Sequence, residues 1–188
     1  MSLIKFLQEH LKRILVIACV LSMQTIDCKE NKSGPIRTRN VKFDRMLRSF
    51  IDEKKVPIMK VDTLAKIYKE KHFPDKYVII DSRESVEYNV SHLSQSRLYS
   101  EDSKYPQGKT IIIYCSVGYR SQNIGKKLLE KGYKVFNLYG GIFEWSNSKL
   151  PLVDESNKQT IEVHGYNKSW SQWIENGKPV LTKSGFFK

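Results

Sequence analysis

The pattern of apolar and polar positions predicts alternating strands and helices through the middle of the chain. Short apolar runs predict strands at residues 58–61, 77–80, 111–113 and 134–138, with a shorter strand near 97–99. Between these runs we predict helices at 43–55, 62–68, 84–88 and 121–131 and after residue 141, most of them marked by apolar side chains at helical spacing. Asp62 is the expected N-cap of the second helix. Strands that alternate with helices favour a parallel sheet with right-handed crossovers, so we predict an α/β fold.

The first 28 residues have the layout of an export signal. Lys5, Lys12 and Arg13 precede an apolar run, residues 14–23. This run falls well short of the ~20 residues needed to cross a bilayer. The alternative is a buried or amphipathic N-terminal helix. We therefore predict a signal peptide or lipoprotein signal at 1–28, and an exported protein that is periplasmic or a membrane-anchored lipoprotein.

Cys28 is the candidate for lipidation because it follows the apolar run and precedes a polar tail. A lipid there would hold the N-terminus at a membrane surface. Asp27 stands where a lipoprotein signal usually has a small residue, so plain secretion is the alternative.

Mass spectrometry of the mature N-terminus tests these interpretations. A cleaved chain with a lipid on Cys28 supports anchoring, and a cleaved chain without one supports secretion. An unmodified, uncleaved Met1 would contradict both.

Three further segments follow the predicted signal. We expect a polar tether and N-terminal helix at 29–55, the α/β domain at 56–150, and an aromatic-rich extension at 151–188. The extension is expected to pack back on the domain as a strand and a short helix. The net charge is +12, but the basic residues are scattered, so no nucleic-acid partner is expected. A basic surface suits small anions or a membrane surface, and we expect a monomer.

Cys115 lies just after the strand predicted at 111–113, in a turn that leads into a helix. Open α/β sheets place their chemistry at this edge. If residues 1–28 are removed or lipidated, Cys115 has no partner for a disulfide. It is then either a small buried hydrophobe or a working thiol.

The surroundings of Cys115 favour the working thiol. The turn directs backbone N–H groups inward, and the positive end of the next helix points the same way. Gly118 frees the backbone for this turn, and Arg120 adds a permanent positive charge. Together these features should stabilise a thiolate, which is a nucleophile. No cofactor is predicted, and no metal, because Cys115 has no second ligand at zinc spacing.

Three motifs, in order along residues of about 56–150, resemble the rhodanese (thiosulfate sulfurtransferase) family. VIIDSRESVEYNVSHL is similar to its D-x-R-E-x-x-E-[FY]-x-x-G-H-I stretch, IIIYCSVGYRS to its Y-C-x-x-G-x-R-S loop, and VFNLYGGIFEW to its L-x-G-G-x-x-x-W ending. The resemblance implies a parallel sheet of about five strands with helices on both faces. It also implies a cysteine persulfide that carries sulfur from a small anionic donor such as thiosulfate to a thiol or cyanide.

Matched position by position, Cys115 corresponds to the sulfur-accepting nucleophile. The loop that surrounds the persulfide corresponds to Ser116, Val117, Gly118, Tyr119 and Arg120. Asp81 and Arg83 correspond to a pair at the end of the preceding strand. We expect a mostly structural role for this pair, with Arg83 able to bind a donor anion.

Other residues of the domain and of the extension are assigned to the fold. They are Glu84, Glu87, Tyr88, His72, His92, His164, Trp170 and Trp173. The sequence departs from the family at residues 91–96, SHLSQS, where G-H-I-x-G-A is usual. We expect this change to alter a loop beside the site.

Two other classes of function stay open. Tyrosine phosphatases hold five residues between cysteine and arginine, whereas four separate Cys115 from Arg120. The shorter ring suits one sulfur better than three phosphoryl oxygens, which argues against a phosphatase or arsenate reductase. A rhodanese fold could also serve as a sulfur carrier or protein-interaction module without turnover. We predict an enzyme, a rhodanese-type sulfurtransferase.

Overall fold

The computed structural model of the protein describes residues 37–181. The predicted signal at 1–28 and Cys28 lie outside the described residues. Within residues 37–181, no helix is both long enough and apolar enough to span a bilayer.

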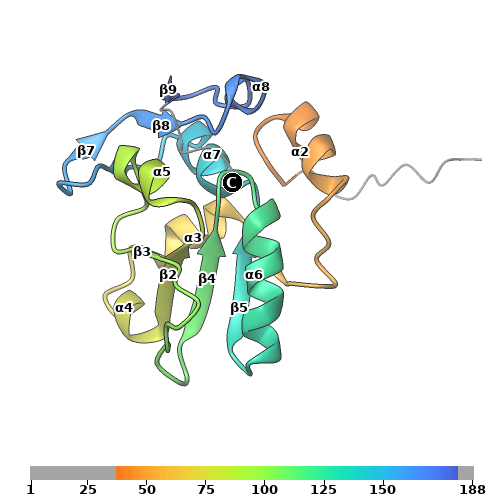
Figure 1. Ribbon diagram of the computed structural model, residues 1–188, viewed down its shortest axis with the longest axis vertical. Coiled ribbons are helices and arrows are strands. Elements are labelled where there is room, and N and C mark those ends of the chain that lie inside the picture. The colour runs from red at the N-terminus through yellow and green to blue at the C-terminus, as the bar shows by residue number, and fades with distance from the viewer. Residues whose placement is uncertain (1–36, 182–188) are drawn as a thin grey trace, which may run out of the picture. The chain divides into compact units, whose positions relative to one another are not determined.

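A five-stranded parallel sheet forms the centre of the fold, in the order β1-β5-β4-β2-β3 (Figure 1). Its strands are β1 (Ile58–Met59), β2 (Tyr77–Asp81), β3 (Arg97–Leu98), β4 (Thr110–Tyr114) and β5 (Lys134–Leu138). Each lies where the apolar pattern predicted a strand, to within a residue or two at either end. The predicted α/β fold with a parallel sheet is therefore confirmed.

Helices connect and cover these strands. They are α2 (Val41–Arg48), α3 (Val61–Ile67), α4 (Phe73–Lys76), α5 (Ser85–Val90), α6 (Tyr119–Glu130) and α7 (Gly141–Asn147). Asn40 caps α2, its side chain accepting hydrogen bonds from the N–H groups of Lys42 and Phe43.

Two details of the helix prediction were wrong. The first helix ends at Arg48 rather than near residue 55, because the backbone N–H of Asp52 donates to the Gln122 side chain at 2.6 Å instead of continuing the helix. The N-cap position of α3 is Lys60, not Asp62. Asp62 lies inside the first turn, where its carboxylate pairs with Arg39 at 3.2 Å.

The sheet is buried on both faces. Ile112 and Tyr114 of β4 pack into a cluster with residues of α2, α3 and α7, whereas Ile111 and Ile113 pack into a second cluster with α6. Every residue of β4 is buried, as the continuous apolar run predicted. Since no face of β4 is left for solvent, its carboxyl end is the part of the strand available for chemistry.

The C-terminal extension packs back on the domain above the carboxyl ends of the strands (Figure 1). It contains two small sheets, β6 (Leu152–Val153) with β7 (Gln159–Thr160) and β8 (Glu162–His164) with β9 (Lys178–Val180), and the short helix α8 (Lys168–Ser171). β8 lies against α5 and α7. Trp173 packs against Phe43 with ring centroids 5.5 Å apart, as expected for a packing residue.

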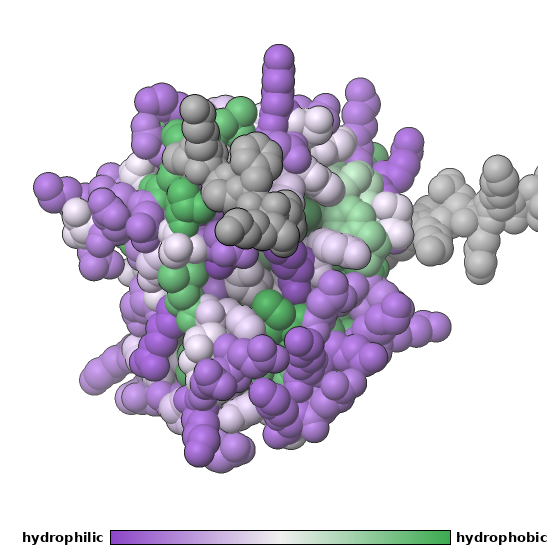
Figure 2. Space-filling view, viewed as in Figure 1, coloured by the Kyte–Doolittle hydropathy of each residue, from purple (hydrophilic) through white to green (hydrophobic). Residues whose placement is uncertain are grey.

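Hydrophilic side chains dominate the lower part of the face in Figure 2, away from the carboxyl ends of the strands. Some of the lysines on α6 have acidic neighbours. Lys126 lies 3.7 Å from Glu130, and Lys127 lies 3.6 Å from Glu101. Such exposed pairs contribute little to stability.

Candidate active site

Cys115 lies directly after β4, at the carboxyl edge of the sheet. Its side chain is 1% exposed, and the backbone N–H of Gly118 donates to its Sγ at 3.1 Å. Gly118 has a φ of 107°, a conformation that glycine adopts without a steric penalty, and α6 begins at the next residue. The chain therefore folds tightly around the sulfur, as the loop sequence predicted.

The start of α7 binds the backbone of this loop through hydrogen bonds to its carbonyl groups. The N–H of Ile142 donates to the carbonyl of Cys115 at 3.0 Å, and the N–H of Phe143 donates to that of Ser116 at 3.1 Å. The approach is so close that a Cβ on Gly141 would lie 2.3 Å from the Cys115 carbonyl oxygen. Gly141, the second glycine of the third motif, is therefore needed for α7 to approach the cysteine loop this closely.

Arg120 closes the loop, but its charge is paired. Its guanidinium donates to both carboxylate oxygens of Glu87, at 2.7 and 2.8 Å, and to Ser116 Oγ at 3.1 Å. Burial raises the pKa of Glu87, but the hydrogen bonds and charge of Arg120 outweigh it and hold that pKa below its usual value. The result is a largely buried ion pair between α5 and α6 beside Cys115.

Glu87 is therefore part of the site, although the sequence analysis assigned it to the fold. It also caps α5 with Glu84, because its Oε2 accepts the Glu84 N–H at 3.0 Å. The sequence signal for Glu87 was its place in the first motif, three residues after Glu84. That spacing is also typical of a capping box, so it did not distinguish the two roles.

Asp81 and Arg83 form a fully buried pair at the end of β2. Arg83 Nε lies 2.9 Å from Asp81 Oδ1, and Nη2 donates to Oδ2 at 2.6 Å and to the Ser91 carbonyl at 2.6 Å. The guanidinium also lies 5.7 Å from the centre of the Tyr114 ring. Neither residue lines the pocket above Cys115, so the structure does not place Arg83 where a donor anion would bind there.

A pocket of about 250 Å³ opens at Cys115. Its lining comprises Cys115, Ser116, Val117, Tyr119, Arg120, Tyr166 and Trp170. The structure thus brings together the predicted loop residues, with Gly118 contacting the sulfur through its N–H. It adds Tyr166 and Trp170 from the extension. The sequence analysis assigned Trp170 to packing and did not single out Tyr166, and the aromatic richness of the extension was the one available signal.

A buried histidine joins the extension to the same network. His164 Nδ1 lies 3.9 Å from Glu87 Oε1 and accepts a hydrogen bond from the N–H of Tyr166 at 3.1 Å. Burial lowers the pKa of His164, an effect that the nearby Glu87 opposes. The sequence analysis had assigned His164 to the fold.

The loop at 91–96, where the sequence departs from the family pattern, packs beneath the site rather than in its wall. The Leu93 N–H donates to the Tyr114 hydroxyl at 3.1 Å, which also lies 3.1 Å from Ser96 Oγ. His92 stacks on Tyr88, and its Nδ1 lies 3.0 Å from the Tyr88 carbonyl oxygen. Nothing in this loop lines the pocket at Cys115.

His72 is exposed and lies 3.2 Å from Asp75.

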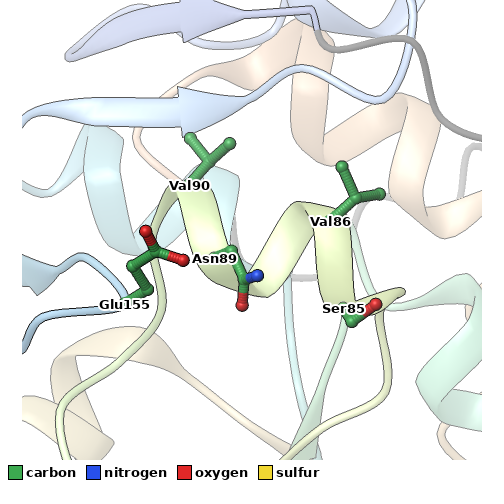
Figure 3. A pocket seen from close by; sticks show the side chains of 5 residues that line it. All are labelled: Ser85, Val86, Asn89, Val90 and Glu155. Atoms are coloured by element: carbon green, nitrogen blue, oxygen red, sulfur yellow. The ribbon is translucent and has the colours of Figure 1, made fainter.

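A second hollow lies on the outer side of α5 and has a different character. Figure 3 shows Val86 and Val90 projecting from one side of the helix, with Glu155 of the C-terminal extension, between β6 and β7, near Asn89. Glu155 is the one ionisable side chain among the lining residues. Its lining holds the hydroxyl of Ser85 but no cysteine, histidine, lysine or arginine, so we place the candidate site at Cys115.

Comparison with known proteins identifies the family. The model of the rhodanese-like domain matches residues 63–148. A Coxiella burnetii protein named thiosulfate sulfurtransferase GlpE is 35% identical over 75 residues, which cover 36% of this chain and 70% of that protein. The chain therefore belongs to the rhodanese-like sulfurtransferase family.

Two further similarities were found. The uncharacterized protein slr1261 of Synechocystis is 30% identical over 90 residues, or 44% of this chain, and the chain spans half the length of that relative. The crystal structure of a thiosulfate sulfurtransferase from Pseudomonas aeruginosa aligns with 69% of this chain and 25% of its own, at 16% identity and a TM-score of 0.49.

The contact between α7 and the cysteine loop generates a prediction. Gly141→Ala should lower the free energy of unfolding in two ways, through left-handed strain of ~1–2 kcal/mol and through overlap with loop backbone costing a further ~1–3 kcal/mol. Urea unfolding of the variant and the wild type measures the loss.

Gly132→Ala is the matched control, because Gly132 also has a positive φ, of 85°, but nothing lies within 4 Å of a Cβ placed there. It should lose only the strain contribution. Equal losses in the two variants would show that α7 does not hold the loop by close contact.

Proposed function

We propose that Cys115 accepts a sulfur atom as a persulfide and passes it to a thiol or cyanide. The observation that carries the proposal is the hydrogen bond from the Gly118 N–H to the buried Sγ of Cys115. The loop that makes this bond is held by α7, whose N–H groups bind the carbonyls of Cys115 and Ser116. An N–H aimed at the sulfur favours an anion there. Membership of the rhodanese-like family and the names of its sulfurtransferase relatives support the proposal.

Thiosulfate is the donor we propose to test first. The Cys115 thiolate attacks the outer sulfur of thiosulfate, and a new S–S bond forms as the sulfur–sulfur bond of thiosulfate breaks. The electron pair of the broken bond leaves with sulfite. Cys115 then carries the outer sulfur as a persulfide anion, and total charge is conserved.

The surrounding residues position and stabilise the sulfur. The Gly118 N–H is placed to donate to it, and the Arg120 guanidinium, paired with Glu87, lies at the edge of the pocket. The attacking group in this proposal is the thiolate form of Cys115, and no side chain of the pocket lining is assigned as a general base. Glu87 and Ser116 act on Arg120 by fixing its orientation, and are positioning residues.

The remaining parts of the functional prediction rest on the sequence. We propose export through residues 1–28, with lipidation of Cys28 as the route to a membrane surface. We also propose that the chain works as a monomer. The chief rival is a sulfur carrier that forms the persulfide but releases it only to a particular protein.

Intact mass after brief exposure to thiosulfate tests the proposal. The wild type should gain about 32 Da, the mass of one sulfur atom, and lose it on addition of cyanide. Cys115→Ser, checked for folding by circular dichroism, should gain nothing. An adduct that persists in Cys115→Ser, or no adduct on the wild type, would contradict persulfide formation from thiosulfate at Cys115. An adduct that cyanide and small thiols fail to remove would favour the carrier.

A further inference from the structure

We propose that Tyr166 and Trp170 of the C-terminal extension form an acceptor subsite above Cys115, specific for small thiols whose bodies are uncharged and apolar. This inference rests on the proposed function, because it assumes that Cys115 is the sulfur-bearing residue. It assigns to the extension a role in choosing the acceptor.

The subsite has aromatic walls. Tyr119, Tyr166 and Trp170 line the pocket at Cys115, and Tyr119 and Tyr166 remain 52% and 37% exposed. Phe50 supports two of these rings edge-on, with centroid distances of 5.7 Å to Tyr119 and 6.3 Å to Trp170. Rings held in this way offer a preformed apolar surface at the mouth of the pocket, where a ligand rather than the protein core would cover it.

The extension is built to place these two rings. Tyr166 has a φ of 63°, which costs free energy in a residue other than glycine, and its N–H is fixed by His164. A Cβ on Gly165 would lie 2.6 Å from the Cβ of Ser171, so α8 packs directly on this turn. The Asn167 side chain then caps α8 by accepting the N–H of Trp170 at 2.9 Å. The strained backbone conformation of Tyr166 is maintained by these neighbouring contacts, and such enforced strain is typical of functional segments.

The charges in the pocket disfavour a charged acceptor. Among the described residues of the lining, Arg120 carries the one permanent charge, and Glu87 already neutralises it. The ring of Tyr166 lies 5.2 Å from the guanidinium carbon of Arg120 and covers it further. At the ring-lined mouth of the pocket, away from the Gly118 N–H that contacts the sulfur, an ionic group on the acceptor would lose water without gaining an unpaired partner, whereas an apolar group gains contact with the rings. The volume of about 250 Å³ suits a small molecule.

The transfer step needs no further reactant. The acceptor thiolate attacks the outer sulfur of the persulfide and forms a new S–S bond. The bond between that sulfur and Cys115 Sγ breaks, and its electron pair returns to Cys115 as a thiolate. The acceptor leaves as its own persulfide, so no external oxidant or reductant is consumed.

Mixed-disulfide formation at Cys115 tests the subsite without requiring a persulfide. Benzyl methanethiosulfonate carries an apolar group, and 2-sulfonatoethyl methanethiosulfonate carries an anionic one. In both, Cys115 attacks the sulfenyl sulfur and methanesulfinate leaves. Each rate is divided by the rate of the same reagent with free cysteine. Labelling of the full chain is followed on the Cys115 peptide by mass spectrometry, so that Cys19 and Cys28 do not contribute.

The wild type should prefer the benzyl reagent by about tenfold, and Trp170→Ala and Tyr166→Ser should each reduce this preference by about three- to fivefold. Tyr166 is exposed enough for its variant to fold even if Trp170→Ala does not. Tyr133→Ala is the control, since Tyr133 packs against Tyr105 in the cluster on the α6 side of the sheet and does not line the pocket. It should keep the wild-type preference.

Two results would overturn the subsite. One is a wild type without preference for the benzyl reagent, and the other is an unchanged preference in Tyr166→Ser. The latter would fit rings that serve a docked protein instead of a small thiol. Because neither measurement uses thiosulfate, a failure of the subsite is distinguishable from a failure of persulfide formation.

Discussion

The carboxylate of Glu87 is the point on which the arrangement around Cys115 depends. It extends from α5, accepts two hydrogen bonds from Arg120 of α6 and one from Ser116 of the cysteine loop, and lies 3.9 Å from His164 of β8. A buried charge is costly unless it is paired, so the hydrogen bonds from Arg120 and Ser116 are held in place by the free energy that their loss would cost. The first turn of α5 is thereby fixed against the cysteine loop and the start of α6, which follow it in the chain by 29 and 33 residues at these contacts.

The second constraint acts on the backbone alone. Because α7 binds the carbonyls of Cys115 and Ser116, the loop is held on the side away from the pocket. Within the same loop, the N–H of Gly118 donates to the sulfur at 3.1 Å. These main-chain contacts add to the side-chain contacts of Glu87 with Ser116 and of Asn137 with the Gly118 carbonyl in fixing the loop.

The sequence predicted those parts of the molecule that are specified locally. Continuous apolar runs such as 111–113 predicted buried parallel strands, and the Cys115 loop was recognisable because its residues are adjacent in the chain. The pairing of Glu87 with Arg120 joins residues 33 positions apart, and its sequence spacing resembled a helix cap. Tyr166 and Trp170 belong to a turn and a four-residue helix, which are too short to show any periodic pattern. Their position over Cys115 follows from tertiary packing, which no local pattern describes.

The release of sulfite tests the central claim most directly, because it reports the first chemical step at Cys115. The protein is mixed rapidly with thiosulfate in the absence of any acceptor, and sulfite is measured against time. A rapid burst of one sulfite per chain in the wild type, absent from Cys115→Ser, is the result that the persulfide account predicts. Sulfite that forms only after an acceptor is added would contradict it, since sulfur would then pass directly from donor to acceptor without residing on Cys115.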